Sequence, residues 1–318
     1  MQDEGRKRDF ILHTSAVILS EGAMFLFAGA SLWGSQVEYK IVREVARGGM
    51  GAIYRAEDRA HNRVVAIKEA CLDPACGGNI AQIRERLVHE MQVLMPLDHP
   101  NIPRVYEQFS RYENAYLVME FVEGQTLRKI QELTPGVKRQ IEESRVLGWA
   151  IQVLDALEYL HTQPKPIVHR DIKPENLILA PDGRVVLVDF GLMKQVERQL
   201  ESGPLIHAIG TIEFAPPEQY SESGSHTDQR SDIYSLGATM YSLLAGHLPP
   251  RAVDRMLPMS MSAPLKRGAL TRINMSVAPR IERIIFKAME IEPEKRYQSA
   301  RAMREAICPS RRYIPLPF

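Results

Sequence analysis

A short polar stretch, Ile167–Leu177, constrains this chain more than any other part of its sequence. It places a carboxylate, an ammonium group and an amide close together, at Asp171, Lys173 and Asn176. The residues before it predict a helix that ends near His161, and those after it predict a strand, so the stretch is expected to form a loop. A proton acceptor, a cation and a metal-binding amide held this close together indicate transfer of an anionic group to a hydroxyl.

The composition indicates a globular protein with a large core. The chain has 318 residues, 45% hydrophobic and 25% charged, which suits one large or two modest domains. Its formal net charge is +1, so no broad positive field indicates a nucleic-acid partner. The three cysteines, Cys71, Cys76 and Cys308, are odd in number and too few for a disulfide framework, which indicates a reducing compartment. Cys71 and Cys76 lack a second ligand pair at zinc spacing, so we expect ordinary loop cysteines. The reducing compartment leads us to expect a cytoplasmic protein.

The first 38 residues are open to two interpretations. A basic cluster at residues 6–8 precedes a mostly apolar run, Phe10–Trp33, which is compatible with a signal peptide or a membrane-spanning helix. Against this, Glu21 lies near the middle of the run, where a charge costs roughly 2.5–3.5 kcal/mol. We therefore favour an extension that packs on the following domain, and we expect no membrane association.

From residue 39 the pattern becomes that of a small β-sheet. Short β-rich runs predict strands at residues 39–45, 52–56, 64–68, 105–109 and 115–119. The first two strands are joined by a glycine-rich turn, Arg47–Gly51, whose bare backbone N–H groups suit close approach to phosphates. Because such turns occur in many sheet proteins, the turn alone is a weak signal.

A buried ion pair is expected between Lys68 and Glu90. Ile83, Leu87, Glu90 and Leu94 follow one another at steps of four, three and four, so they share one face of a predicted helix. Glu90 is thus a carboxylate within an apolar stripe, and Lys68, at the end of a β-rich strand, is the cation that would offset its burial. Without that helix, an exposed strand end would be the default interpretation of Lys68.

The second half of the chain is mainly helical. Amphipathic and apolar patterns predict helices at residues 144–161, 231–244, 276–290 and 299–307. A hairpin at residues 176–179 and 185–188 follows the polar loop and leads to Asp189-Phe190-Gly191. Asp189 and Asn176 therefore lie one hairpin apart, and both offer the oxygen ligands that Mg²⁺ prefers.

In order and spacing, these elements resemble those of the eukaryotic-like (Hanks-type) serine/threonine protein kinases, and most of all the bacterial members. The resemblance covers residues 39–307. It implies an α+β, bilobal protein-kinase fold, in which the N-lobe has a small five-stranded β-sheet and one main helix and the larger C-lobe is mainly helical. The implied organisation is an N-terminal extension, the N-lobe, the C-lobe and a C-terminal tail, at residues 1–38, 39–122, 123–308 and 309–318.

The resemblance also implies the residues that act on ATP. The implied catalytic residues are Asp171, as acceptor of the substrate proton, with Lys173, Lys68 and Glu90. The implied metal ligands are Asn176 and Asp189. The implied ATP-binding residues are Ala46, Gly48, Gly49, Gly51, Ile53, Ala66, Lys68, Met119, Glu120, Val122 and Ile178. Ala46 stands where the family has its first glycine, which we expect to stiffen the turn without abolishing nucleotide binding.

Structural roles are implied for residues outside the reacting centre. They are Arg170, Phe190, Glu218, Asp232 and Arg296. Glu218 ends a Pro-Pro-Glu triplet where the family has Ala-Pro-Glu, and it is expected to pair with Arg296 over a long range. Asp232 is expected to be buried and to bond the backbone of the polar loop.

Regulation is expected through the connection between Asp189 and Glu218. Its hydroxyls, Ser202 and Thr211, are the expected autophosphorylation sites, because Arg170 next to Asp171 suggests a phosphate partner.

The sequence thus predicts a kinase that transfers the γ-phosphoryl group of ATP to serine and threonine hydroxyls of proteins. Lys173 favours this class over tyrosine kinases. The expected cofactors are ATP and Mg²⁺, with Mn²⁺ as an alternative metal, and the expected partners are protein substrates and a second copy in a homodimer for autophosphorylation in trans.

Two alternatives remain open at this point. A pseudokinase scaffold would bind nucleotide and partner proteins without catalysis, but such proteins usually lose one of Lys68, Asp171 and Asp189, which are all present here. A small-molecule phosphotransferase on a related fold would lack the full set of Glu218, Asp232 and Arg296.

Overall fold

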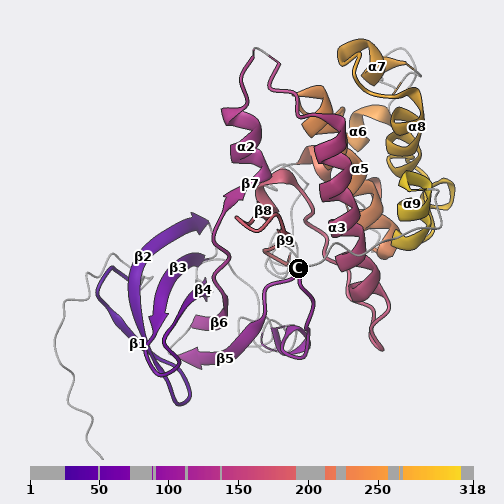
Figure 1. The fold of residues 1–318 in the computed structure, drawn as a ribbon. Helices are drawn as coiled ribbons and strands as arrows, with labels where there is room; N and C mark the ends of the chain where they lie inside the picture. Colours follow the sequence, from indigo (N-terminus) through magenta and orange to yellow (C-terminus); the bar gives the residue numbers. More distant parts are fainter. Residues whose placement is uncertain are drawn as a thin grey trace, which may run out of the picture.

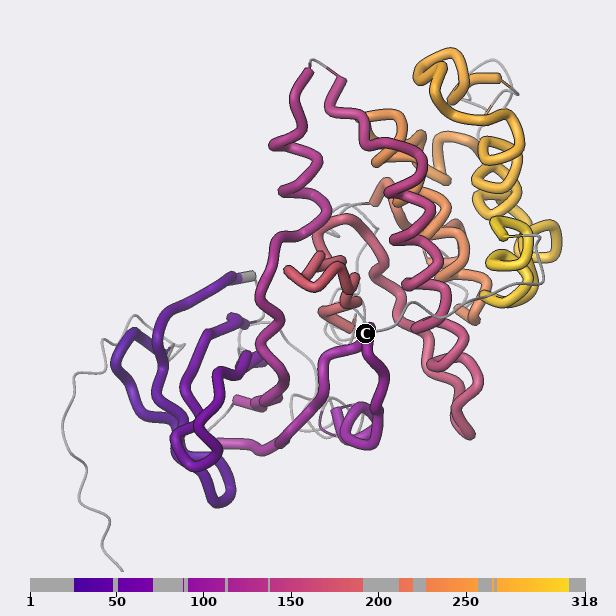
Figure 2. Tube along the Cα trace, in the orientation of Figure 1, coloured from indigo at the N-terminus to yellow at the C-terminus, as the bar shows by residue number. Residues whose placement is uncertain are grey.

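Two lobes of different composition make up the protein, a sheet and a helical body (Figure 1). The computed structural model describes residues 26–48, 51–71, 88, 91–111, 114–136, 138–190, 212–219, 227–256, 265 and 268–308. The curved sheet of the N-lobe, in indigo to magenta, lies to one side of the helices of the C-lobe, and a small three-stranded sheet lies between them (Figures 1 and 2).

The N-lobe is built on a six-stranded antiparallel sheet with the strand order β1-β2-β3-β4-β6-β5. Its strands are β1 (Ser31–Trp33), β2 (Glu38–Gly48), β3 (Gly51–Asp58), β4 (Arg63–Cys71), β5 (Val105–Arg111) and β6 (Asn114–Glu120). The five strands predicted from the sequence correspond to β2 to β6. Buried side chains alternate with more exposed ones along β3, as expected for a strand with one face on a core.

The sixth strand, β1, comes from the segment that we expected to be an N-terminal extension. Leu32 is buried and pairs with Tyr39 of β2, while Ser31 and Trp33 on either side are exposed. Three alternating residues within a longer apolar run are too short a pattern to distinguish a strand from a helix. The strand is therefore defined by its pairing with β2, which only the fold provides.

Each face of the sheet has its own hydrophobic core. On one face, Ala70 and Leu117 pack with Met91 and Leu94 in the main core, which continues into the C-lobe. The opposite face, here called the outer face, carries a second core that is packed by Leu26, Ala30 and Val37. The buried residues of the outer face are Leu32, Tyr39, Ile41, Ala52, Tyr54, Ala56, Val65, Ile67, Phe109, Tyr116 and Val118. Residues 26–37 are thus packed onto the sheet.

The C-lobe is organised around one central helix. Its helices are α2 (Leu127–Leu133), α3 (Glu143–His161), α5 (Gln229–Ala245), α6 (Ala252–Arg255), α7 (Ala269–Ile273), α8 (Pro279–Ala288) and α9 (Ala300–Ile307). Every residue of α5 from Ser231 to Ala245 is buried, and the helix contacts α3, α7, α8 and α9. Asp228 caps its N-terminus, and Gly246 ends it in the left-handed conformation.

The small sheet between the lobes has the order β7-β8-β9. Its strands are β7 (Gln125–Thr126), β8 (Leu177–Leu179) and β9 (Val185–Leu187). Short 3₁₀ helices complete the fold: η2 (Pro174–Asn176), η3 (Ile212–Phe214), η4 (Pro217–Gln219) and η5 (Pro293–Lys295). The β8–β9 hairpin, predicted from the sequence, delivers Asn176 and Asp189 to the region between the lobes.

The helix predicted at residues 276–290 is shorter in the structure and begins at Pro279. Asn274 Oδ1 accepts the N–H of Ser276 at 3.0 Å, which holds the residues before the helix in a turn. Pro279 suits the first helical position because its missing N–H would be unpaired there. Among the described residues, no helix combines the length and apolar character needed to cross a bilayer.

Candidate active site

Asp232, in the first turn of α5, is fully buried and holds the backbone of the polar loop. Its Oδ2 accepts the N–H of His169 at 2.9 Å, and its Oδ1 accepts the N–H of Arg170 at 2.8 Å. Its Oδ2 also lies 2.8 Å from Nε2 of His161. Burial raises the pKa of Asp232, but the hydrogen bond and charge of His161 outweigh this and hold the pKa below its ordinary value.

His161 is a partner that the sequence analysis did not identify. It is the last residue of α3, at the end of the buried stripe that includes Leu157 and Leu160. A polar side chain at the end of such a stripe was the available signal. Its partner lies 71 residues away, so the pairing depends on how α3 packs against α5.

Asp171 is buried and is held by two side chains of its own loop. Asn176 Nδ2 donates to the Asp171 backbone oxygen and to its Oδ2, both at 2.8 Å. Lys173 Nζ lies 3.1 Å from the same Oδ2. The three side chains that the sequence places in one loop therefore meet at the Asp171 carboxylate. This arrangement holds the carboxylate in position, as a reacting group requires.

Two residues of this region have a left-handed backbone although they are not glycine. Arg170 has a φ of 68° and Asp189 has a φ of 60°, and each such conformation costs about 1–3 kcal/mol. At Arg170 the conformation is held by the bond from its N–H to Asp232, and its Nε donates to Thr227 Oγ1 at 2.9 Å. The strain is thus located at Asp189 itself and at Arg170, the residue before Asp171.

Lys68 and Asp189 form an ion pair and a hydrogen bond between the lobes. Lys68 lies in β4 and its side chain is only 12% exposed. Burial raises the pKa of the Asp189 carboxyl, but the charge of Lys68 outweighs this and holds the pKa below its ordinary value. Asp189 is therefore a carboxylate at neutral pH.

Phe190, the residue after Asp189, packs against His169 of the polar loop. Its ring centroid lies 4.8 Å from that of His169, and both side chains are buried. Burial lowers the pKa of His169, so this ring is neutral at physiological pH. The contact joins the segment of Asp189 to the loop of Asp171 through packing.

The residues expected to bind ATP lie around the same region on several strands. Gly48 and Gly51 face each other across the β2–β3 turn, and Ala46 pairs with Ile53. A Cβ on Gly51 would lie 1.9 Å from the backbone oxygen of Glu69, so only glycine fits here. Glycine is thus required at position 51 by packing against β4, in addition to the close approach to phosphates that was expected of the turn.

The expected adenine-binding residues follow β4 and β6. Ala66 pairs with Met119, near the end of β6. The N–H of Glu120 donates to the Arg104 oxygen at 2.8 Å, and Val122 follows in the connection to β7. Ile178 lies in β8.

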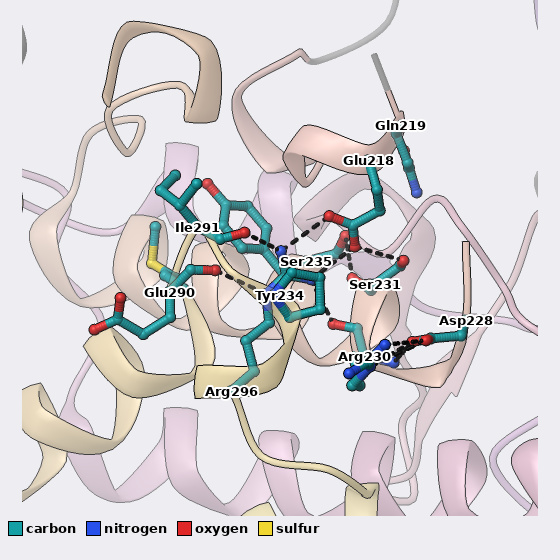
Figure 3. Close-up of polar contacts among 12 residues, drawn as sticks. Glu218, Gln219, Asp228, Arg230, Ser231, Tyr234, Ser235, Glu290, Ile291 and Arg296 are labelled. Carbon is teal, nitrogen blue, oxygen red and sulfur yellow. Dashed lines mark hydrogen bonds and ion pairs between the residues drawn. The ribbon is translucent and has the colours of Figure 1, made fainter. Parts of the chain in front are cut away.

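Glu218 and Arg296 form the long-range ion pair that the sequence led us to expect (Figure 3). Arg296 Nη1 and Nη2 donate to the two carboxylate oxygens at 2.7 and 2.9 Å. Ser231 Oγ donates to Glu218 Oε1 at 2.7 Å, and Arg296 also donates to the backbone oxygens of Glu290 and Ile291. Burial raises the pKa of Glu218, and the bonds and charge of Arg296 lower it below its ordinary value.

The oxygen atoms of Asn176 and Asp189 fit the metal that was expected between them. Asn176 uses its amide nitrogen for Asp171, so its amide oxygen is the atom that remains for a cation. Lys68 contacts Oδ1 of Asp189, which leaves Oδ2 as a ligand. Such an oxygen-only donor set suits a hard divalent cation. Four expected site residues lie outside the described residues: Gly49, Glu90, Ser202 and Thr211.

Comparison with known proteins agrees with this arrangement. The chain matches the protein kinase domain over residues 39–307. A probable serine/threonine-protein kinase of Streptomyces coelicolor is 34% identical over 275 residues, which are 85% of this chain and 39% of that protein. Serine/threonine-protein kinase PrkC of Bacillus subtilis is 32% identical over 272 residues, which are 85% of this chain and 40% of that protein. The chain thus spans about two fifths of the length of these relatives.

Solved structures share the fold. The apo form of PpkA has a TM-score of 0.68 and 24% identity, and the match covers 92% of this chain and 100% of that one. The PknI kinase domain of Mycobacterium tuberculosis has a TM-score of 0.65 and 25% identity, with 89% and 98% covered. The bilobal α+β architecture of this chain is therefore that of protein kinase domains. Because the match to the protein kinase domain covers most of its length, this chain belongs to the protein kinase family.

Proposed function

We propose that this chain is a protein kinase that transfers the γ-phosphoryl group of ATP to serine and threonine hydroxyls of proteins. The observation that carries the proposal is the buried Asp171 carboxylate, held by Asn176 and Lys173 in a loop whose backbone is fixed by Asp232. Membership of the family implies the use of ATP, a divalent metal and protein substrates in general. Lys173 and the names of the bacterial relatives support the serine/threonine class.

The proposed roles follow from the placement of each side chain. Asp171 orients the acceptor hydroxyl and takes its proton, and Lys173 beside it stabilises the negative charge of the transferred group. Lys68 orients the α- and β-phosphates, with the backbone of Gly48 and Gly51 above them. Catalysis then depends mainly on position and electrostatics, because a loose phosphoryl-transfer transition state needs little covalent help.

Nucleotide and metal selection extend the proposal. Met119, Glu120 and Val122 would contact the adenine, enclosed by Ile53, Ala66 and Ile178. Asn176 and Asp189 would hold Mg²⁺ or, as an alternative, Mn²⁺. When bound, the metal neutralises charge on the phosphates of ATP.

Regulation and location are further parts of the proposal. Autophosphorylation at Ser202 or Thr211, in trans within a homodimer, would supply an anion near Arg170. The cysteine usage and the need for ATP support a cytoplasmic catalytic domain. We keep the division into residues 1–38, 39–122, 123–308 and 309–318, with β1 as the part of the first segment that pairs with the N-lobe sheet.

The pseudokinase alternative has no observation in its favour. Lys68, Asp171 and Asp189 are all present, and each is in contact with another member of the site. A folded scaffold without catalysis would not need this arrangement of buried charges, which costs free energy to maintain.

The test is phosphate transfer from γ-labelled ATP with Mg²⁺ to casein and to the chain itself, with labelled sites mapped by mass spectrometry. Asp171→Asn should lower kcat by about 10²- to 10⁴-fold. Asp182→Asn is the matched control, because Asp182 lies in the exposed turn of the β8–β9 hairpin, and it should keep full activity. Equal label on the unaltered protein and Asp171→Asn would refute the proposed function.

A further inference from the structure

Glu69, the residue after Lys68, is a buried carboxylate on the outer face of the sheet. It is 1% exposed. Tyr54 Oη donates to its Oε2 at 2.7 Å, and Asn114 Nδ2 and Tyr116 Oη donate to its Oε1 at 2.7 and 2.8 Å. All three of these donors are uncharged. Burying a carboxylate without hydrogen bonds would cost roughly several kcal/mol of folding free energy. The Glu69 side chain is therefore held where it can keep these three donors.

The donors remain protonated over a wide pH range. Burial, followed by the hydrogen bond and charge of Glu69, raises the pKa of Tyr54. Burial and the charge of Glu69 likewise raise the pKa of Tyr116. Both hydroxyls therefore keep the hydrogen that they donate.

Glu69 and Lys68 are linked through the backbone of β4. Successive side chains of a strand point to opposite faces, so Glu69 faces the outer core while Lys68 faces Asp189 across the lobes. The backbone of β4 between them is short and extended. A carboxylate clamped on the outer face therefore limits how far the lysine on the inner face can move.

The same residue supports the glycine-rich turn. The backbone oxygen of Glu69 lies so close to Gly51 that a Cβ there would be 1.9 Å from it. Gly51 pairs with Ala70 and Ala52 pairs with Glu69 in the β3–β4 ladder. The residue that carries the ammonium group, Lys68, and the turn at Gly51 thus both adjoin the backbone of Glu69.

The cluster is also tied to the segment before the sheet. Tyr54 Oη accepts the N–H of Leu26 at 3.2 Å, and Leu26 packs on the outer core. Tyr54 therefore connects residues 26–37 to the strand that carries Lys68.

We propose that Glu69 is a positioning residue for ATP: its clamped side chain sets the place of Lys68 and of the turn at Gly51, and Tyr54 joins this clamp to residues 26–37. The inference rests on the proposed function, because it assigns Lys68 and the turn to the phosphates of ATP. It predicts a defect in ATP affinity and not in the recognition of the protein substrate, because Asp171 and Lys173 lie in the other lobe.

The experiment compares Glu69→Ala, Glu69→Gln, Tyr54→Phe and Tyr39→Phe with the unaltered protein. Tyr39→Phe is the matched control, because Tyr39 Oη is on the same face but donates to Glu107 of β5, at 2.6 Å, and not to Glu69. The readouts are KM for ATP, KM for casein, kcat, the Kd of a fluorescent ADP analogue with Mg²⁺, and Tm.

Glu69→Ala should raise KM for ATP and the Kd of the analogue by about ten- to a hundredfold, as expected when phosphate-binding groups are misplaced. KM for casein should stay within about twofold of the value for the unaltered protein, because the substitution does not change the groups proposed to contact the protein substrate. Glu69→Gln, which keeps an acceptor oxygen for Asn114 and Tyr116, should restore most of the affinity. Tyr54→Phe should show a smaller defect of the same kind, and Tyr39→Phe should show none.

A merely structural role would lower Tm and leave KM for ATP and the Kd unchanged in Glu69→Ala and Tyr54→Phe, and that result would overturn the inference. If Glu69→Ala does not fold, the inference is tested by comparing Tyr54→Phe with Tyr39→Phe in the same readouts. Failure of the proposed function is distinguishable, because the unaltered protein would then transfer no phosphate to casein, whether or not it binds the analogue.

Discussion

The fully buried guanidinium of Arg296 donates hydrogen bonds to both carboxylate oxygens of Glu218, 78 residues earlier in the chain. The pair joins η4, directly after the connection that was expected to regulate the enzyme, to the segment between α8 and α9 (Figure 3). The remaining N–H groups of Arg296 donate to backbone oxygens, so the charge is desolvated without being left unpaired. The end of the connection is thus fixed to the C-lobe core.

Arg296→Ala should destabilise the protein by about 3–5 kcal/mol, because it leaves the buried Glu218 carboxylate without its cation. The measurement is urea unfolding followed by circular dichroism. Arg301→Ala is the control, because Arg301 and Glu305 form a pair with both side chains about two-thirds exposed, and it should change the free energy of unfolding very little. A loss below about 1 kcal/mol for Arg296→Ala would show that the pair contributes no more than a surface contact.

Acid should weaken the protein partly through the same pair. The pKa of Glu218 lies below its ordinary value of 4.5 in the folded state, so between these two values the unfolded chain binds more protons than the folded one. The contribution of Glu218 to stability is therefore full above pH 4.5 and is lost as the pH falls through the lowered pKa. Glu218→Gln lacks this dependence. The difference in free energy of unfolding between the unaltered protein and Glu218→Gln should therefore become smaller from pH 7 to pH 3.5 in urea titrations. A difference that stays constant would contradict a lowered pKa of Glu218.

Asp232→Ala should lower kcat by about 100-fold, because the backbone of His169 and Arg170 loses the acceptor that positions Asp171. KM for ATP should change little, since Lys68 and the glycine-rich turn lie in the other lobe. Asp228→Asn is the control at the start of the same helix: the Asp228 side chain caps α5 and bonds Arg230, whereas the Asp232 side chain bonds the backbone of the polar loop. Steady-state kinetics with circular dichroism on both variants separates misplacement from unfolding. A similar kcat for the two variants would show that Asp232 does not position Asp171.

Leu32→Ala should destabilise the protein by about 2–5 kcal/mol, the usual range for a buried leucine. Leu32 is 4% exposed in the outer core, whereas its neighbour Trp33 is 46% exposed. Trp33→Ala should therefore have a much smaller effect, although tryptophan is the larger side chain. Thermal unfolding of both variants tests whether β1 is a structural part of the N-lobe. The reverse order of effects would mean that β1 does not pack as described.

Much of the fold follows from patterns that are local in the sequence. The strands β2 to β6, the β8–β9 hairpin and the long helices α3 and α5 were predicted close to their observed bounds, because backbone periodicity and turn residues act over a few positions. Asp171, Lys173 and Asn176 belong to one loop, so their meeting was predictable from spacing alone. Lys68 and Asp189 were predicted as site residues by their place in the order of motifs.

Their partners, however, depend on packing between distant segments. Lys68 contacts Asp189 across 121 residues, and His161 contacts Asp232 across 71. Strand β1 forms because it pairs with β2, and Glu69 is buried on the outer face, where Tyr54, Asn114 and Tyr116 donate to it. The sequence by itself determined most of the secondary structure and the chemical groups of the candidate site, since these depend on near neighbours. Only the tertiary structure decided which charges are buried and with whom they pair, because desolvation is a property of the whole packed chain.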